Sequence, residues 1–250
     1  MLISLTGKPT AKEAWATILK PDDIVGLKFN RSGQDVIHTS SAMAEALIES
    51  LESSGWARER IVGLELPPDI VASAGTRTPR PGFDARVTDF KSGADNFAAV
   101  LRQVTALISV PFLKTHNIAG LTCSLKNLSH GLIKHPARYH KNHCSPYIAD
   151  IVAAEPIRSK FRLALVDAMR VVYQGGPRAS ARALGDEGVL LMSRDPVAAD
   201  AVGLDVLNRT RKRAGLADVA ASAAEIPYLA AAHRARLGVA VRYGINTVRI

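Results

Sequence analysis

The sequence predicts an α/β fold, a layered sandwich on a largely parallel or mixed sheet. Short apolar runs of strand-like composition alternate with helical patterns along most of the chain. Strands that alternate with helices favour parallel pairing, with the helices packed on the faces of the sheet. No Pro-, Gly- or Ser-rich linker and no repeat of fixed period divides the 250 residues. We therefore expect a single α/β domain over 1–250.

Turn residues bound the short apolar runs that we expect to form strands. In chain order these strands cover 24–29, 60–66, 107–111, 161–166 and 189–192, with edge strands at 239–242 and 247–250. Between the second and third strands, the segment 69–93 is rich in Pro, Gly and Arg, which predicts a loop with a short strand near Val87. A polar loop is expected over 175–188.

The expected helices show apolar residues at helical spacing or begin at capping residues. They cover 12–19, 39–54, 93–102, 125–133, 147–154, 195–212 and 216–236, the last of these broken at Pro227. Asp195 directly precedes Pro196, which is a typical helix start. The Asp195 carboxylate is therefore expected to be a structural cap.

Composition favours an anionic partner. The net charge is +9 and the sequence pI is 9.8. Nonspecific nucleic-acid binding is one use for such a charge, but an aromatic content of 5% and the lack of a helix-turn-helix or zinc-finger pattern argue against it. No apolar run approaches the ~20 residues of a membrane span. The oligomeric state stays unknown at this point.

The candidate site centres on an acid-free span between Asp95 and Asp150. Average usage would place roughly half a dozen acids there, yet the span holds six Lys and Arg residues and five of the seven histidines. Its polar side chains follow the strand that ends at Pro111 and are Lys114, Thr115, His116, Thr122, Ser124, Lys126 and Asn127. Lys114 to His116 are expected in a polar turn beyond that strand, where open α/β sheets bind ligands. Such a cleft suits a carboxylate or phosphate; the alternative is a solvated surface whose cations pair with acids from elsewhere.

Other element ends are expected to complete this cleft. Lys28 and Asn30 follow the strand at 24–29, and Asp167 follows the strand at 161–166. Asp200, in the helix after Asp195, is a further ligand-binding candidate. The helix starting near 125 would aim its N–H groups and dipole at the same anion. The plainer alternatives are an exposed lysine at 28 and a structural ion pair at 167.

In the leading hypothesis the protein is an enzyme that acts on a small anionic metabolite. Lys114 and Lys126 neutralise the anion, and His116 or Asp167 transfers a proton. The orienting groups are Asn127, Thr122 and Ser124. No nucleophile elbow, P-loop or Rossmann fingerprint identifies the reaction.

The alternative function is a non-catalytic metal-binding or redox accessory protein. His140 and His143 are three residues apart, and Cys144 is adjacent, so a divalent metal site is conceivable if the segment is helical. The spacing matches no zinc motif, and a solvated His-rich loop explains it equally. The two cysteines, Cys123 and Cys144, are too few for a disulfide framework, and two reduced thiols are the simpler interpretation.

The central motif resembles a bacterial and archaeal family called domain of unknown function 362. It reads Val-Pro-Phe-Leu-Lys-Thr-His at 110–116 and Ala-Gly-Leu-Thr-Cys-Ser-Leu-Lys-Asn at 119–127. Weaker matches follow the family's order at 25–30, 166–167, 175–177 and 195–200. The resemblance covers about 20–210 and implies the fold and the site, including Lys28 and Asn30, more firmly than a reaction.

The resemblance also bears on cofactors and compartment. Some family members carry appended Cys-rich iron–sulfur modules, whose clusters need about four thiolates. With two cysteines, this chain is not expected to hold such a cluster by itself. Relatives often carry a twin-arginine export signal. The sequence lacks the pattern of a secretory signal at its start, so a cytoplasmic location is expected unless such a signal was removed.

Overall fold

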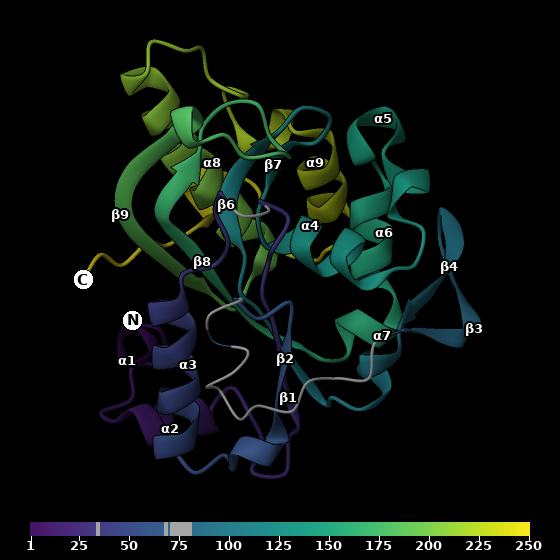
Figure 1. Cartoon of the computed structure of the whole chain (residues 1–250), viewed down its shortest axis with the longest axis vertical. Coiled ribbons are helices and arrows are strands. Elements are labelled where there is room, and N and C mark those ends of the chain that lie inside the picture. Colours follow the sequence, from purple (N-terminus) through teal and green to yellow (C-terminus); the bar gives the residue numbers. More distant parts are fainter. Residues whose placement is uncertain (34–35, 68–69, 71–81) are drawn as a thin grey trace.

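A seven-stranded sheet forms the centre of the protein (Figure 1). The structure is a computed structural model and describes residues 1–33, 36–67, 70 and 82–250. Each strand is hydrogen-bonded to the next in the order β2-β1-β5-β8-β6-β7, and β9 also pairs with β8. The strands are β1 Val25–Lys28, β2 Ile61–Leu64, β5 Ala106–Ser109, β6 Phe112–His116, β7 Gly120–Thr122, β8 Phe161–Val172 and β9 Leu184–Ser193. Pairing is parallel except between β6 and β7 and between β8 and β9. This mostly parallel sheet confirms the predicted α/β sandwich.

Helices cover both faces of the sheet. A hydrophobic core lies between the sheet and the helices on each face, and successive side chains of a strand point into one core and then the other. In β8, Leu163 and Leu165 belong to one core, whereas Ala164 and Val166 belong to the other. The first core includes α1 Leu2–Thr6, α2 Ala11–Ala16 and α3 Ser41–Ser53. The second core includes α4 Ser124–Ser129, α6 Tyr147–Ala153, α8 Pro196–Arg213 and α9 Pro227–Arg234. Shorter helical segments are α5 Lys141–Cys144, α7 Glu155–Arg158, and the 3-10 turns η1 Arg58–Arg60, η2 Ala99–Arg102, η3 His130–Leu132, η4 Pro136–Tyr139, η5 Ala181–Ala183, η6 Ala223–Glu225 and η7 Arg242–Gly244.

The strands β5 and β6 lie end to end along β8. Ile108 of β5 pairs with Leu163, while Phe112 of β6 pairs with Asp167. Pro111 lies at the break, where its lack of an N–H suits an interruption of the ladder. Its carbonyl still accepts a hydrogen bond of 2.8 Å from the Asp167 N–H. The residues after Pro111, predicted as a polar turn, are therefore a second buried strand.

Two further sequence predictions are wrong in the type of element. The predicted helix at 93–102 is mostly strand, since β4 Gly93–Ala98 pairs with β3 Phe83–Phe90 before the turn η2. Alternate residues of β4 are buried, and the rings of Phe90 and Phe97 meet edge to face at 6.5 Å. The predicted edge strands at 239–242 and 247–250 do not form, and most of these tail residues remain exposed. They bury too little apolar surface to offset the entropy lost on ordering a strand.

Other elements differ mainly in length. The predicted helices at 12–19, 39–54, 125–133, 147–154 and 195–212 correspond to α2, α3, α4, α6 and α8. The stretch 216–236 forms only η6 and α9, because Pro227 starts a helix instead of interrupting one. β8 and β9 extend well beyond the predicted strands and shorten the loop between them. The strand near Val87 is confirmed as β3, and part of the predicted loop before it, residue 69 and residues 71–81, lies outside the described residues.

Across the described residues, no helix combines the length and the apolar character needed to cross a membrane. This agrees with the absence of a long apolar run in the sequence.

Asp195 ties the start of α8 to the C-terminal segment. Its Oδ1 accepts hydrogen bonds from the N–H groups of Val197 and Ala198, and its Oδ2 accepts one from Val239, each at 2.8 Å. We expect Asp195→Ala to lower the free energy of unfolding by about 1–2 kcal/mol, as for other lost helix caps. Urea denaturation measures this. The exposed Asp22→Ala is the control and should change stability by no more than about 0.5 kcal/mol. Equal effects of both substitutions would contradict the capping role.

Candidate functional site

Three lysines from distant parts of the sequence are buried together at the carboxyl end of the parallel strands. Lys28 ends β1, Lys114 lies in β6 and Lys126 in α4, and their exposed fractions are 1%, 1% and 6%. Burial, followed by repulsion from Lys126, lowers the pKa of Lys114 to about 8. Lysines are rarely buried unless they are paired. We call these three residues the lysine cluster.

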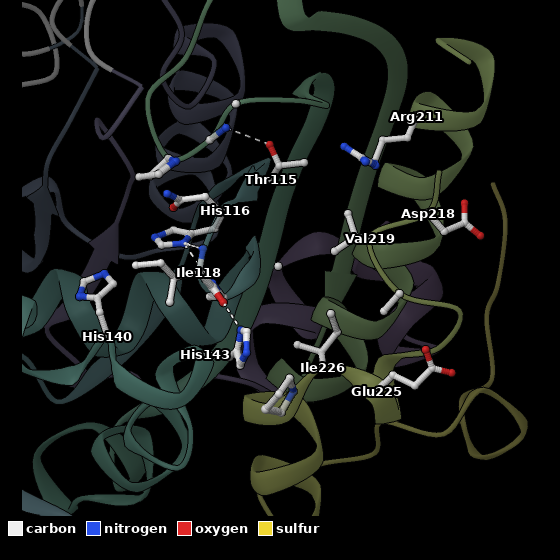
Figure 2. A pocket seen from close by; sticks show the side chains of 18 of the residues that line it. Thr115, His116, Ile118, His140, His143, Arg211, Asp218, Val219, Glu225 and Ile226 are labelled. Carbon is white, nitrogen blue, oxygen red and sulfur yellow. Dashed lines mark hydrogen bonds between the residues drawn. The ribbon is translucent and has the colours of Figure 1, made fainter. Parts of the chain in front are cut away.

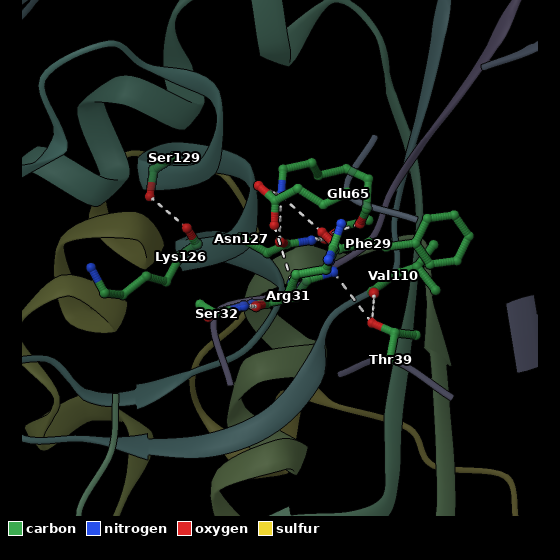
Figure 3. A network of polar contacts seen from close by, with 12 residues as sticks. Phe29, Arg31, Ser32, Thr39, Glu65, Val110, Lys126, Asn127 and Ser129 are labelled. Carbon is green, nitrogen blue, oxygen red and sulfur yellow. Dashed lines mark hydrogen bonds and ion pairs between the residues drawn. The ribbon is translucent and has the colours of Figure 1, made fainter. Parts of the chain in front are cut away.

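Lys28 has an ionic partner. Its Nζ lies 2.9 Å from Oε1 of Glu65 and donates to Oδ1 of Asn127 at 3.1 Å and to the carbonyl of Phe29 at 2.8 Å. In return, Nδ2 of Asn127 donates to the Lys28 carbonyl at 2.8 Å. Figure 3 shows Glu65 and Asn127 meeting in this network. The charge of Lys28 is thus balanced, and the pair with Asn127 joins β1 to α4.

Lys114 is held by neutral groups. Its Nζ donates to Oγ of Ser32 at 2.5 Å and to the carbonyl of Pro177 at 3.0 Å. The Ser32 hydroxyl in turn donates to Oδ1 of Asn30 at 2.5 Å. Within the described part of the chain, no carboxylate forms an ion pair with Lys114. Its hydrogen-bond partners are therefore neutral, through a relay that ends at Asn30, and its Nζ also lies 5.1 Å from the centroid of the Phe112 ring.

Lys126 lies among imidazole rings and a thiol. Its Nζ is 3.3 Å from Nε2 of His140 and 3.9 Å from Sγ of Cys144, and burial lowers its pKa to about 8. The ring of His140 stacks on His116 at 5.6 Å between centroids and meets the edge of His130 at 4.6 Å. Lys126 also has no carboxylate partner among the residues that the structure describes. A second buried cation is thus surrounded by neutral side chains.

His116 is held in one tautomer. Its Nδ1 accepts hydrogen bonds of 3.2 Å from the N–H groups of Ile118 and Ala119, so we assign the proton to Nε2. Burial, then the charge of Lys126, lowers the pKa of His116 to about 3. At neutral pH the ring is therefore a neutral hydrogen-bond donor.

A cavity of about 880 Å³ opens in front of His116 and His140. Figure 2 shows the histidines on one side and Asp218 and Glu225 on the other. The pocket is lined by the end of β6, the segment around α5, the turn after β8, the last part of α8 and the segment that leads into α9. Its lining residues are 115–120, His140, His143, 175–178, Arg211, 218–220 and 225–227. Lys114 and Lys126 do not line this pocket. They bond to Pro177 and His140, which do.

The hydroxyl groups predicted to bind the ligand have different surroundings. Thr115 Oγ1 donates to the Val172 carbonyl and accepts from the Gly176 N–H, and so holds the turn after β8 against β6. Thr122 Oγ1 and Ser124 Oγ are buried and have no hydrogen-bond partner within the described residues. Only Thr115 of these three lines the pocket.

The two predicted carboxylates bond to the backbone instead of to the lysines. Asp167 lies inside β8, and its carboxylate accepts from the N–H groups of Ser40 and Met169 at 2.7 and 3.0 Å. Asp200 is fully buried and accepts from the Leu125 N–H at 3.3 Å. Burial raises the pKa of Asp167, and raises that of Asp200 to about 7. The amino end of α4, expected to face the ligand, is therefore occupied by the protein's own carboxylate.

The predicted metal ligands separate into two directions. His143 is exposed, and its Nδ1 lies 2.9 Å from the Ile118 carbonyl on the pocket side (Figure 2). His140 and Cys144 lie inward with His130, and the ligand atoms of these three residues are all within 4.8 Å of one another. Sequence reasoning missed His130, although it lies in the same acid-free, His-rich span. It also missed Ser32 and Glu65. Both lie shortly after the end of a strand, β1 and β2 respectively, and that position could have indicated them.

A sequence model of the domain of unknown function 362 family matches residues 81–205, half of the chain. The chain belongs to this family. The match confirms the resemblance carried by the central motif, and no curated protein or solved structure matches the chain. Lys114, Lys126 and the inward-facing His130 and His140 lie within this family domain, whereas Lys28, Asn30 and Glu65 precede it. The extent of the domain over 1–250 stays a prediction.

In this family member the lowered pKa of Lys114 makes stability depend on pH. Between pH 8 and the ordinary lysine value of 10.5, the unfolded chain keeps a proton on Lys114 that the folded chain has lost. The free energy of unfolding therefore rises with pH in this window, by about 1.4 kcal/mol per pH unit at most from one group. Lys114→Met removes this contribution. We expect the variant to be more stable than the wild type at pH 7 and this advantage to shrink toward pH 10.5.

Urea denaturation below, within and above this pH window measures the difference. The control is Lys91→Met, at an exposed position in the turn between β3 and β4, which should follow the wild-type curve. A stability difference between Lys114→Met and wild type that stays constant with pH would contradict the burial of a charged ammonium.

Proposed function

We propose that the chain is an enzyme that binds a small anionic metabolite, through a carboxylate or phosphate group, in the pocket in front of His116 and His140. One observation carries the proposal. Lys114 and Lys126 are buried directly behind the pocket wall, and no carboxylate pairs with either among the described residues. An uncompensated buried ammonium costs several kcal/mol. An anion bound at the wall would offset part of that cost.

The pocket has the size and the polarity for such a ligand. A volume of about 880 Å³ falls in the range of roughly 300–1,000 Å³ typical of small-molecule sites. The charged lining residues are two arginines, Arg178 and Arg211, and two acids, Asp218 and Glu225, so their charges balance. The sign of the local potential then comes from the lysines behind the wall. The N–H at Nε2 of His116 supplies a neutral donor to orient the anion.

Lys114 is the best-supported group for proton transfer. Its pKa of about 8 places both protonation states within reach near neutral pH, as a general acid or base requires. A ligand oxygen that replaced the Pro177 carbonyl or the Ser32 hydroxyl as acceptor would contact its Nζ. His116, whose Nδ1 is occupied by two N–H groups, and Asp167, which accepts from the backbone, have less freedom for this role. We assign orientation to His116.

The alternative, a non-catalytic metal-binding or redox accessory protein, has support from two of its three sequence-based ligands. His140 and Cys144 both lie against Lys126, whereas His143 bonds to the Ile118 carbonyl. The anion pocket requires none of these three as a metal ligand. An enzyme with an anionic substrate therefore accounts for more of the buried charge than the accessory role does.

Calorimetric titration with inorganic phosphate and with malonate, on protein purified without either, tests the proposal. We expect at least one of the two probes to bind the wild type. Lys114→Met should weaken that binding by about tenfold or more, which corresponds to 1.4 kcal/mol. Lys91→Met removes the same charge at an exposed position and should bind as the wild type does.

Two results would overturn the anion site. One is the absence of binding by either probe to the wild type. The other is an equal loss in the Lys114→Met and Lys91→Met variants, because that would assign binding to overall charge. Circular dichroism and thermal unfolding of both variants show whether each is folded during the titration.

A further inference from the structure

We propose that His130, His140 and Cys144 form a binding site for a divalent transition-metal ion, with Zn²⁺ as the ion that best suits the donors, and that Lys126 occupies this site when the metal is absent. Their three ligand atoms lie within 4.8 Å of one another. Two imidazoles and a thiolate are a ligand set that zinc accepts, with a fourth position left for water or another ligand. This site shares His140 with the wall of the anion pocket, but metal binding at it requires no anion in that pocket.

The ring of His140 is already oriented as a metal ligand. Its Nδ1 lies 3.0 Å from the Pro136 carbonyl, and donation there leaves the lone pair on Nε2. That Nε2 faces inward, 3.3 Å from Nζ of Lys126. Histidines that bind metals commonly donate their other ring N–H to a carbonyl or carboxylate, which sets the tautomer and the ring orientation.

His130 has an equivalent arrangement. Its Nε2 lies 3.3 Å from the Tyr139 carbonyl, and its Nδ1 lies 3.1 Å from Oγ of Ser129. We assign donation from Nε2 to the carbonyl, which leaves Nδ1 as the ligand atom once the serine hydroxyl turns away. Pro136 and Tyr139 both belong to the 3-10 turn η4. The carbonyls of this one turn therefore orient the rings of His140 and His130.

A left-handed turn directs Cys144 inward. Asn142, His143 and Cys144 have φ values of 48°, 54° and 62°, a conformation that residues other than glycine seldom adopt in succession. In this turn the ring of His143 lies on the pocket side, while Cys144 is fully buried. The sequence spacing placed His143 in the ligand set with Cys144, but in the structure His130 is the second histidine beside the thiol.

Lys126 lies where the metal would bind. Its Nζ contacts both Nε2 of His140 and Sγ of Cys144, at 3.3 and 3.9 Å. An ammonium at this place satisfies the same lone pairs that a metal would use, and it repels a second cation. The long, flexible lysine side chain must move before a divalent ion enters. Donor atoms on a tetrahedral zinc are about 3.5 Å apart, so binding would also draw the three ligands, now within 4.8 Å of one another, together by up to about 1.3 Å.

Titration of the full chain with Co²⁺, a spectroscopic substitute for zinc, tests the site. The wild type, with its thiols reduced, should bind one equivalent and develop a thiolate-to-cobalt charge-transfer band that Zn²⁺ abolishes. Lys126→Met removes the competing ammonium at similar side-chain volume and should raise the affinity about tenfold or more. Cys144→Ser should lose the band, and His130→Gln should lower the affinity by at least about tenfold.

His143→Gln is the matched control, because it changes a histidine one residue from Cys144 but outside the ligand set. It should bind Co²⁺ as the wild type does. If the buried His130 or Cys144 variants do not fold, the wild type, Lys126→Met and His143→Gln decide the matter. The proposal fails if neither wild type nor Lys126→Met develops the band, or if His143→Gln weakens binding as much as the loss of a ligand would.

Discussion

The burial of ammonium groups beside few acids is the constraint on which the rest of the structure depends. Three lysines lie at the carboxyl end of the sheet, and in the described chain only Lys28 has an ionic partner, Glu65. The others rely on dipoles and lone pairs from Ser32, from the Pro177 carbonyl and from side chains around Lys126. Such contacts recover only part of the hydration energy of an ammonium. Apolar side chains at positions 114 and 126 would avoid this loss of hydration energy, so packing of the fold alone does not account for the two lysines.

The fold brings these charges together by interrupting one strand. Because Pro111 separates β5 from β6, the chain continues along β8 and carries Lys114 and His116 into the sheet instead of into a loop. The antiparallel return through β7 then starts α4, which presents Lys126 and Asn127. Asn127 reaches back to Lys28 at the end of β1. Neighbouring parallel strands end at the same edge, so residues about 100 positions apart in sequence meet there.

Much of this was predictable from the sequence, and the exceptions share a physical reason. Strand and helix periodicity indicated the α/β sandwich, and the acid-free span indicated a concentration of positive charge. The direction in which an individual side chain points depends on where a strand ends and on the backbone conformation of single residues. The spacing of apolar residues in the sequence reports neither. β8 extends past 166, which places Asp167 inside a strand beneath α3, and the left-handed residues after Lys141 separate His143 from His140 and Cys144, with which it was expected to share a site. Tertiary packing determines both.

If both proposed sites exist, Lys126 and His140 connect them. A metal at His130, His140 and Cys144 would displace the Lys126 ammonium, and the pocket bounded by His140 offers polar space nearby. The Lys126 ammonium would then move from the protein interior toward the bound anion, and the attraction between the ammonium and the anion would increase. Coupling between two binding sites is reciprocal, so the anion would strengthen metal binding by the same factor. Lys126 is suited to such a connection, because no ion pair with a residue in the described part of the chain has to break before its side chain moves.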